Sequence, residues 1–182
     1  MAFEKPLPIV TPLSLPGVLL IETRRWADER GFFTESWQAE DFEKIGIDAR
    51  FMQDNLVMNE KAGTLRGLHW QAAPEGQAKM VRCLSGEILD VAADVDPESP
   101  TYGEWTAVPL KAEEGKSLYI PAGYAHGYVT KSDNALVLYK VDRPWCPSAE
   151  RNIRWDDPRL AVAWGVESPI LSPKDRAAPF LA

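Results

Sequence analysis

The sequence predicts an all-β protein in which antiparallel strands close into one barrel. Fifteen prolines and twelve glycines interrupt the 182 residues at short intervals, and the segments between them are rich in the β-branched and aromatic residues typical of strands. No segment of helical length lies between them to connect parallel neighbours. The expected strands are residues 18–23, 31–37, 50–57, 64–71, 78–84, 87–95, 104–110, 116–122, 125–130 and 134–142.

Helices contribute little to the predicted fold. Residues 39–46, AEDFEKIG, place Phe42 and Ile45 three positions apart among charged residues, which is the spacing of a short amphipathic helix. A second short helix is expected near the C-terminus. No internal repeat or linker is visible, so we expect one domain over residues 1–182, with the loop-rich tail after Asp156 wrapping the barrel.

Composition and charge limit the classes of partner. The chain is 45% hydrophobic and 26% charged, as globular proteins are. Its formal charge of -7 argues against nucleic acid or an anionic membrane as the main partner, although a few converging basic side chains still suffice for a small anion. Because the sequence has neither a membrane-length apolar segment nor a secretion signal at its start, a cytoplasmic location is expected.

The residue counts disfavour a metal site. Iron, copper and zinc sites usually draw on two or three imidazoles plus a carboxylate, and this chain has only His69 and His126. Cys83 and Cys146 lack the CxxC spacing of a zinc site and have no secretory context, so both are expected to be free thiols. We therefore expect no metal.

Alternation along the strands predicts which side chains point inward. In residues 134–142, Tyr139 shares a face with Val137 and is expected to point into the barrel. Lys79 shares a face with Val81 and Cys83, which would carry an ammonium into apolar surroundings, an unusual place for a lysine without a function.

Arg66 and His69 differ in parity along their predicted strand. Both face one cavity only if the strand is bulged or bent between them, and Gly67 permits such a distortion. A shared cavity for these two residues therefore depends on such a distortion.

Taken singly, these residues have ordinary explanations: His69 as a half-buried histidine, Tyr139 as a core aromatic and Asp175 as a helix cap. Together they suit proton transfer at a carbon beside a ketone. A neutral histidine is a suitable base, a carboxylate such as Asp175 fixes its tautomer, and a cation such as Lys79 stabilises an enolate. A tyrosine on the other side then returns a proton, as inversion requires.

The residues also match a known family over nearly the whole chain, in order. The matching segments include RGFFTESW (30–37), LRGLHWQ (65–71), QAKMVRCLSGEILDVAADV (77–95), IPAGYAHGYV (120–129) and LSPKD (171–175). The sequence closely resembles the dTDP-4-dehydrorhamnose 3,5-epimerases. The resemblance implies a cupin-like double-stranded β-helix, or jelly roll, with a homodimeric assembly, exchanged N-terminal strands, no metal and no organic cofactor.

The resemblance also implies roles for individual residues. It makes His69 the general base, paired with Asp175, Tyr139 the proton donor, and Lys79 the neighbour of the keto or enolate oxygen. A dTDP-linked 4-keto-6-deoxy sugar would be bound by Arg30, Glu35, Gln53, Asn55, Arg66, His126, Trp145, Glu150 and Lys174, some of them supplied across the dimer.

Three positions depart from the pattern of that family. Trp145 stands six residues after Tyr139, where many members have a tyrosine that stacks on thymine, and an indole offers a larger face for the same contact. Asp96 stands where an arginine is common, and Arg151 where a glycine is common. Neither of the last two is expected to take part in the chemistry.

The implied activity is epimerisation at C3 and C5 of dTDP-4-dehydro-6-deoxy-D-glucose to give dTDP-4-dehydro-L-rhamnose. Alternatives remain open. A monofunctional 3- or 5-epimerase on a related nucleotide sugar would carry the same base and acid, and a sugar ketoisomerase would also need an enolate. A non-catalytic sugar-binding barrel would need neither base nor acid, and a metal-dependent cupin would need more histidines.

Overall fold

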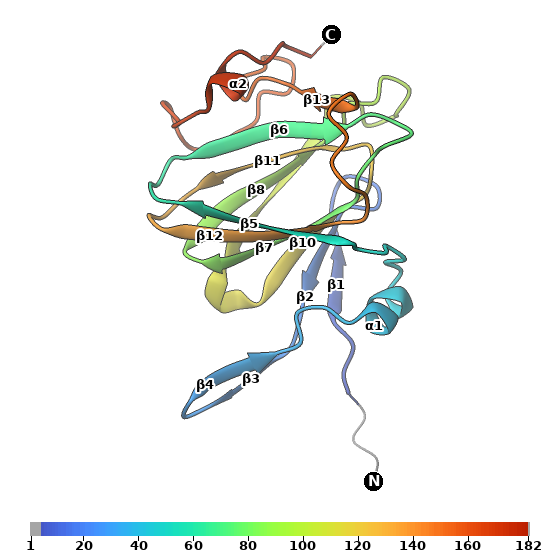
Figure 1. Cartoon of the computed structure of the whole chain (residues 1–182), viewed down its shortest axis with the longest axis vertical. Coiled ribbons are helices and arrows are strands. Elements are labelled where there is room, and N and C mark those ends of the chain that lie inside the picture. Colours follow the sequence, from blue (N-terminus) through green and yellow to red (C-terminus); the bar gives the residue numbers. More distant parts are fainter. Residues whose placement is uncertain (1–4, 182) are drawn as a thin grey trace.

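In the computed structural model, which describes residues 5–181, two antiparallel sheets face each other and a separate hairpin leaves the body (Figure 1). The six-stranded sheet has the order β1 (Ile9–Pro12), β2 (Leu19–Glu22), β10 (Lys116–Ile120), β7 (Lys79–Ser85), β12 (Ala135–Val141) and β5 (Gln53–Asn59). The five-stranded sheet has the order β13 (Glu150–Asn152), β6 (Leu65–Gln71), β11 (Ala125–Thr130), β8 (Glu87–Ala93) and β9 (Trp105–Lys111). The predicted all-β, cupin-like fold is confirmed.

Most of the predicted strands are present, and three short ones escape prediction. β1 is largely exposed and ends in a proline, β3 (Arg25–Asp28) has two apolar residues side by side between two charged ones, and β13 has only three residues, all polar. Such segments lack the alternation of apolar and polar residues on which strand prediction relies. These short segments become strands because the neighbouring strands offer free backbone N–H and C=O groups to pair with, not because their side chains favour strand structure.

The main core lies between the two sheets. It collects the inward side chains of both, such as Val81 and Val137 from the six-stranded sheet and Ile88 and Ala92 from the five-stranded one. Along β8 the intervening residue Asp90 points to the same side, and it is completely buried. A carboxylate in this position indicates where the apolar core gives way to a polar cavity.

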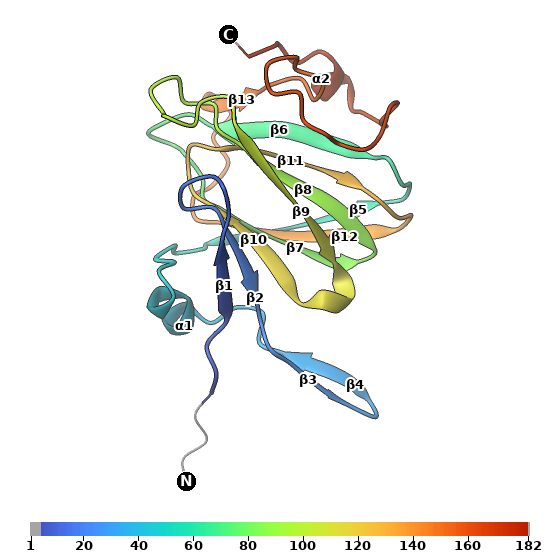
Figure 2. The same cartoon turned by 180° about the vertical axis from the view of Figure 1, so that it is seen from behind.

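The outer face of the five-stranded sheet is covered by the C-terminal tail. Val91 and Ala93, on the other face of β8, pack in one cluster with Leu160 and Trp164 from the tail. Ile170 forms a parallel bridge with Thr64, just before β6. As a result, the short helix α2 (Pro173–Arg176) lies beside β6, as Figure 2 shows from behind.

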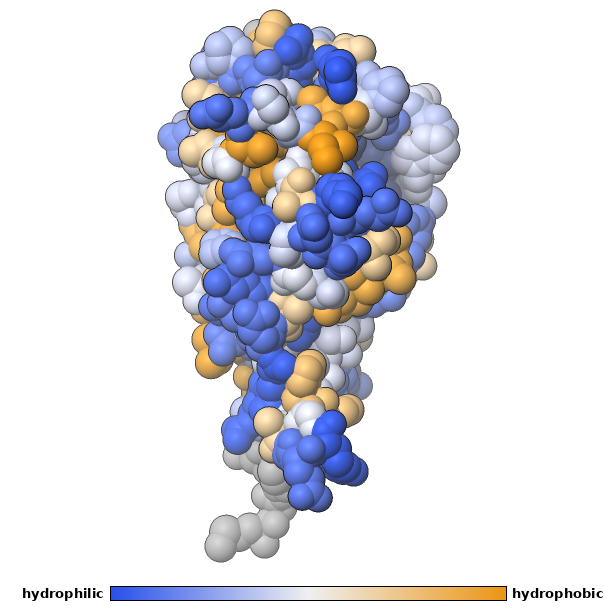
Figure 3. Space-filling view, turned by 90° about the vertical axis from the view of Figure 1, so that its left-hand side faces the viewer, coloured by the Kyte–Doolittle hydropathy of each residue, from blue (hydrophilic) through white to orange (hydrophobic). Residues whose placement is uncertain are grey.

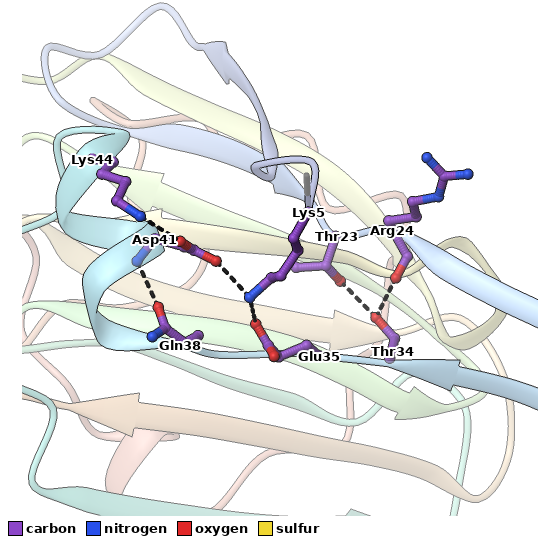
Figure 4. A network of polar contacts seen from close by, with 8 residues as sticks. All are labelled: Lys5, Thr23, Arg24, Thr34, Glu35, Gln38, Asp41 and Lys44. Atoms are coloured by element: carbon purple, nitrogen blue, oxygen red, sulfur yellow. Dashed lines mark hydrogen bonds and ion pairs between the residues drawn. The ribbon is translucent and has the colours of Figure 1, made fainter. Parts of the chain in front are cut away.

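The helix predicted at residues 39–46 is found as α1 (Ala39–Lys44), and a 3-10 turn covers Ala112–Glu114. Gln38 caps α1 by accepting from the Asp41 amide at 2.6 Å. Lys5 lies between Asp41, at 2.5 Å, and Glu35, which it also contacts (Figure 4). This network holds the N-terminal segment against α1.

A hairpin of β3 and β4 (Gly31–Thr34) projects from the body (Figures 1 and 2). The side chains of Phe33 and Phe32 on this hairpin are 67% and 53% exposed.

No helix within residues 5–181 is long and apolar enough to cross a membrane.

The strand β6 is bulged near Gly67, which is one of the two distortions that a shared cavity for Arg66 and His69 requires. His126 on β11 pairs with His69 on β6, but Tyr128 pairs with Arg66, so three steps along β6 match two along β11. Gly67 has a φ of +122°, and a Cβ there would lie 2.5 Å from the Gly127 Cα and 2.7 Å from the His126 carbonyl oxygen. Only glycine fits this close approach of two backbones.

Gly67→Ala is expected to lower the free energy of unfolding much more than Gly31→Ala, measured by urea denaturation. Both glycines have nearly the same φ, +122° and +126°, but a Cβ at Gly31 meets nothing within 4 Å. The backbone cost is therefore shared, and the clash at Gly67 adds about 1–3 kcal/mol. Equal losses in the two variants would show that the close approach at Gly67 does not constrain the fold.

Candidate active site

A cavity of about 300 Å³ opens between the two sheets. It is lined from both sheets, the loop after β12 and the C-terminal tail by Val57, Arg66, His69, Trp70, Gln71, Gln77, Lys79, His126, Tyr128, Tyr139, Trp145, Glu150, Ser172, Lys174 and Asp175. The cavity thus brings together nine of the site residues predicted from sequence: His69, Lys79, Tyr139, Asp175, Arg66, His126, Trp145, Glu150 and Lys174. These residues come from five separate strands, the loop after β12 and the tail.

His69 and Asp175 form a hydrogen-bonded pair at one wall. The His69 Nε2 lies 2.5 Å from the Asp175 Oδ1, and Ser172, the N-cap of α2, donates its hydroxyl to the Asp175 Oδ2 at 2.8 Å. Burial raises the pKa of Asp175, but the bonds from His69 and Ser172 outweigh it and hold that pKa below its usual value. Asp175 is therefore an ionised acceptor, so Nε2 carries hydrogen and Nδ1 is left free.

A second histidine pairs with a deeper carboxylate. The His126 Nε2 lies 2.7 Å from the Asp90 Oδ1, and the Asp90 side chain is completely buried. Burial raises the pKa of Asp90, while the neighbouring His126 and Lys79 oppose that rise. The pair anchors the His126 ring in the strand next to His69.

Lys79 is buried in the cavity, at 6% exposure, as the alternation in β7 predicts. Its ammonium nitrogen has no hydrogen-bond partner among residues 5–181. Burial lowers its pKa to about 8, and Asp142 and Asp90 oppose the decrease. A cation held without a bonded counter-ion is arranged to meet negative charge on a ligand.

Tyr139 faces the cavity from β12, in the sheet opposite His69. Burial raises its pKa, and the nearby Arg66 guanidinium opposes the rise. Tyr128, from β11, is more deeply buried, which raises its pKa to about 12. Both hydroxyls therefore stay protonated at neutral pH.

An exposed tryptophan and an ion pair line one part of the cavity. Trp145 is 60% exposed there, and Lys174 pairs with Glu150 at 2.6 Å. The loop before β13 is fixed by buried Gln71, which accepts from the Cys146 amide at 2.6 Å and donates to the Pro144 carbonyl at 3.3 Å. Trp145 lies between those two attachment points.

Four predicted binding residues lie outside this cavity. Gln53 and Asn55 share a face of β5 with Val57 and hydrogen-bond to each other at 2.8 Å. Arg30 lies at the turn of the projecting hairpin and pairs with Asp28, and Glu35 follows the hairpin and contacts Lys5.

Among the polar residues that build the site, sequence reasoning missed Asn59, Gln71, Asp90 and Tyr128, together with Gln77 and Ser172 of the cavity lining. Four of them hold or adjoin predicted site residues: Asn59, Gln71, Asp90 and Tyr128. One signal was present, because Asp90 is a lone carboxylate in the apolar run EILDVAADV, on the inward parity of its strand. The other three have no such signal, since each works through contacts with residues distant in sequence. As for metals, no cluster of three or more His, Cys, Asp or Glu side chains in the described chain is placed to hold one.

A family model described as dTDP-4-dehydrorhamnose 3,5-epimerase matches residues 12–182. The chain belongs to this family. It is 46% identical over 175 residues to the enzyme of that name from Salmonella typhimurium, with 95% of each chain covered. The resemblance inferred from sequence is confirmed.

Solved structures of other proteins in the family share the fold of this chain. A Legionella pneumophila dTDP-6-deoxy-D-glucose-3,5-epimerase in complex with dTDP-4-keto-L-rhamnose matches with a TM-score of 0.91 and 41% identity, over 96% of this chain and 93% of that one. ChmJ, a 3'-monoepimerase from Streptomyces bikiniensis in complex with dTDP-quinovose, matches with a TM-score of 0.88 and 35% identity, over 93% and 86%.

The two histidine pairings are expected to respond separately to substitution, which imidazole 15N NMR measures directly because the chain has only two histidines. Asp90→Asn should move the ring signals of His126 far more than those of His69, and Asp175→Asn should do the reverse, since each removes one carboxylate from one Nε2. Equal movement of both rings in either variant would contradict the two separate pairs.

Proposed function

We propose that the chain inverts C3 and C5 of dTDP-4-dehydro-6-deoxy-D-glucose, giving dTDP-4-dehydro-L-rhamnose. The observation that carries this proposal is the placement of His69 and Tyr139 on opposite sheets of one cavity, with the Lys79 ammonium also facing it. Inversion requires that a proton leaves one face of the sugar ring and another arrives at the opposite face. A base and an acid on opposed walls meet that requirement.

His69 acts as the base. Because Nε2 donates to Asp175, Nδ1 keeps the lone pair that takes the proton from the carbon next to the ketone. The charge of Asp175 then stabilises the imidazolium. Its bond to Ser172 holds the carboxylate, and through it the ring, in place.

Lys79 stabilises the enolate formed from the ketone. Its ammonium is buried and lacks a bonded partner within residues 5–181, so an oxyanion supplies what the site lacks. Tyr139 returns the proton on the other face. Burial keeps it protonated in the resting site, and the nearby Arg66 charge stabilises the tyrosinate that results.

The remaining cavity residues bind the rest of the substrate. Arg66 and His126 contact the phosphates or the sugar, Trp145 stacks on the base, and Glu150 and Lys174 contact the sugar nucleotide. The exposed indole of Trp145 at the mouth supports the stacking assignment.

A homodimer accounts for the predicted residues outside the cavity. Arg30 and Glu35 lie on or just after the projecting hairpin and do not line the cavity of their own chain, and in the dimer they complete the cavity of the second copy. Exposed Phe33 on the hairpin and Leu56 and Met58 on the outer face of β5 support an interface, and Figure 3 shows hydrophobic patches among hydrophilic side chains on one side of the body. Sedimentation at the mass of a single chain would refute the proposed dimer. We also propose that the protein acts in the cytoplasm.

A single-site epimerase is the second candidate, because the 3'-monoepimerase ChmJ has the same fold at 35% identity. His69, Asp175 and Tyr139 serve either reaction. The difference depends on whether the enolate turns in the cavity so that a second carbon meets His69.

In deuterated water, the wild-type protein is expected to incorporate deuterium at both C3 and C5 of dTDP-4-dehydro-6-deoxy-D-glucose, followed by NMR. His69→Ala should abolish exchange at both carbons, and Tyr139→Phe should keep some exchange but lose inversion, because it removes only the returning acid. Tyr119→Phe, outside the cavity, is the matched control and should behave as wild type. Deuterium at one carbon alone would establish the single-site epimerase, and full activity of His69→Ala would remove His69 from the mechanism.

The value of kcat/KM is expected to fall as the pH rises through about 8. Burial disfavours the Lys79 ammonium, so the charged form is present below a pKa of about 8 and lost above it. In Lys79→Arg the cation persists, so the alkaline decline should move upward even though the maximal rate is lower. An unchanged decline in Lys79→Arg would assign it to another group.

A further inference from the structure

Arg66 reaches the cavity from the bulge in β6 and is held by one side chain. Its Nε donates to the Oδ1 of Asn59 at 2.8 Å. No other hydrogen bond of the Arg66 guanidinium is formed within residues 5–181. The two terminal nitrogens are therefore left to bind a ligand in the cavity that Arg66 lines.

Asn59 is itself fixed from several sides. It is 2% exposed, at the end of β5, and its Nδ2 donates to the Ala135 carbonyl oxygen at 3.0 Å. A carbonyl only accepts, so the amide nitrogen must face Ala135 and the amide oxygen must face Arg66. The Tyr128 hydroxyl lies 3.3 Å from the same Nδ2.

The partner of Arg66 is neutral, which distinguishes it from another cation at the cavity. Lys174 pairs with the Glu150 carboxylate at 2.6 Å, whereas no Asp or Glu among the described residues forms an ion pair with Arg66. An amide oxygen orients the guanidinium while leaving its charge uncompensated. A carboxylate in the same place would orient it and also neutralise it.

We propose that Asn59 is a positioning residue that aims Arg66 at the diphosphate of the bound nucleotide sugar while preserving its positive charge. The inference rests on the proposed function, because it assigns the ligand anion to a nucleoside diphosphate. The same orientation keeps the Arg66 charge beside Tyr139, whose pKa it lowers against the effect of burial. Asn59 thus acts on binding through Arg66 and not by contact with the ligand.

A double-mutant cycle tests the positioning. Calorimetric titration with dTDP is carried out on wild type, Asn59→Ala, Arg66→Lys and the double variant. Asn59→Ala is expected to weaken binding about 10-fold, the effect of one hydrogen bond to a charged group. In the Arg66→Lys background, which has no Nε, the same change should cause no further loss. If Asn59→Ala does not fold, Asn59→Ser, which keeps a polar group but draws it back from Arg66, takes its place.

Asn59→Asp tests the importance of a neutral partner. The carboxylate keeps an acceptor toward Arg66 but loses the Nδ2 donor to the Ala135 carbonyl, so thymidine binding serves as the control for the shape of the cavity. Where thymidine binding is retained, a purely geometric role predicts dTDP binding as in wild type. We expect instead a loss of at least about 10-fold for dTDP and little change for thymidine, which lacks the diphosphate, because the Arg66 charge is then neutralised.

The outcomes separate this inference from the proposed function. If the wild type binds dTDP, but Asn59→Ala weakens binding equally in the wild-type and Arg66→Lys backgrounds, or not at all, Asn59 does not act through Arg66 and the inference is wrong. Wild-type affinity in Asn59→Asp would overturn the claim about charge. If the wild type itself neither binds dTDP nor exchanges deuterium, the proposed function fails, and the inference with it.

Discussion

The close approach of β6 and β11 at Gly67 is the constraint on which the cavity depends. A regular strand sends alternate residues to opposite faces, so Arg66 and His69, three apart, would point to opposite sides. The extra residue of the bulge returns both to the inner face, and the backbone of Gly127 approaches so closely that no side chain fits at position 67. Because of this local irregularity, the Asp175 pair of His69 and the Asn59 bond of Arg66 lie at one cavity.

A polar cavity inside a two-sheet core is stable only if the charges it buries are compensated. The protein meets this requirement with two histidine–carboxylate pairs, one more deeply buried than the other. Asp90 is completely buried and bonds His126, whereas Asp175 bonds the more open His69, whose side chain is 33% exposed. Lys79 is the exception, since its ammonium lacks a bonded partner among residues 5–181 and relies on the nearby charges of Asp142 and Asp90. Unpaired buried charge costs stability, and such a cost is commonly found where a ligand completes the interaction.

The sequence contains enough to predict most of the strands and the inward direction of two cavity side chains, because those depend on short-range periodicity. Alternation alone places Tyr139 and Lys79 inward, and the parity conflict between Arg66 and His69 shows that a shared cavity needs a bulge or a bend between them. The meeting of His69 with Asp175, 106 positions away, requires the resemblance to a family, since nothing local shows that the tail returns to β6. Asn59 and Gln71 are beyond both approaches, because an amide in a strand looks the same whether it faces water or holds a neighbour. The short strands β3 and β13, which lack an alternating pattern, escape prediction for a related reason: backbone pairing, not side-chain pattern, forms them.

The net negative charge of the whole chain disfavours polyanions, whereas the basic groups of the cavity favour a small anion. The cavity determines which small ligand is bound. A formal charge of -7 repels polyanions, whose binding sums over a wide surface. A small anion instead responds to the few charged groups that lie within one Debye length of the solution. At that range the positions of the charged groups matter more than the net charge of the chain. Glu150 neutralises Lys174 and each histidine has its carboxylate, so the uncompensated charge is concentrated on Arg66 and Lys79. These two cations come from opposite sheets, so a ligand that carries negative charge at one end and develops it at the other is held by both walls at once. A nucleotide-linked ketone, with its diphosphate and its enolate, has that distribution, whereas a simple anion would satisfy only one of the two.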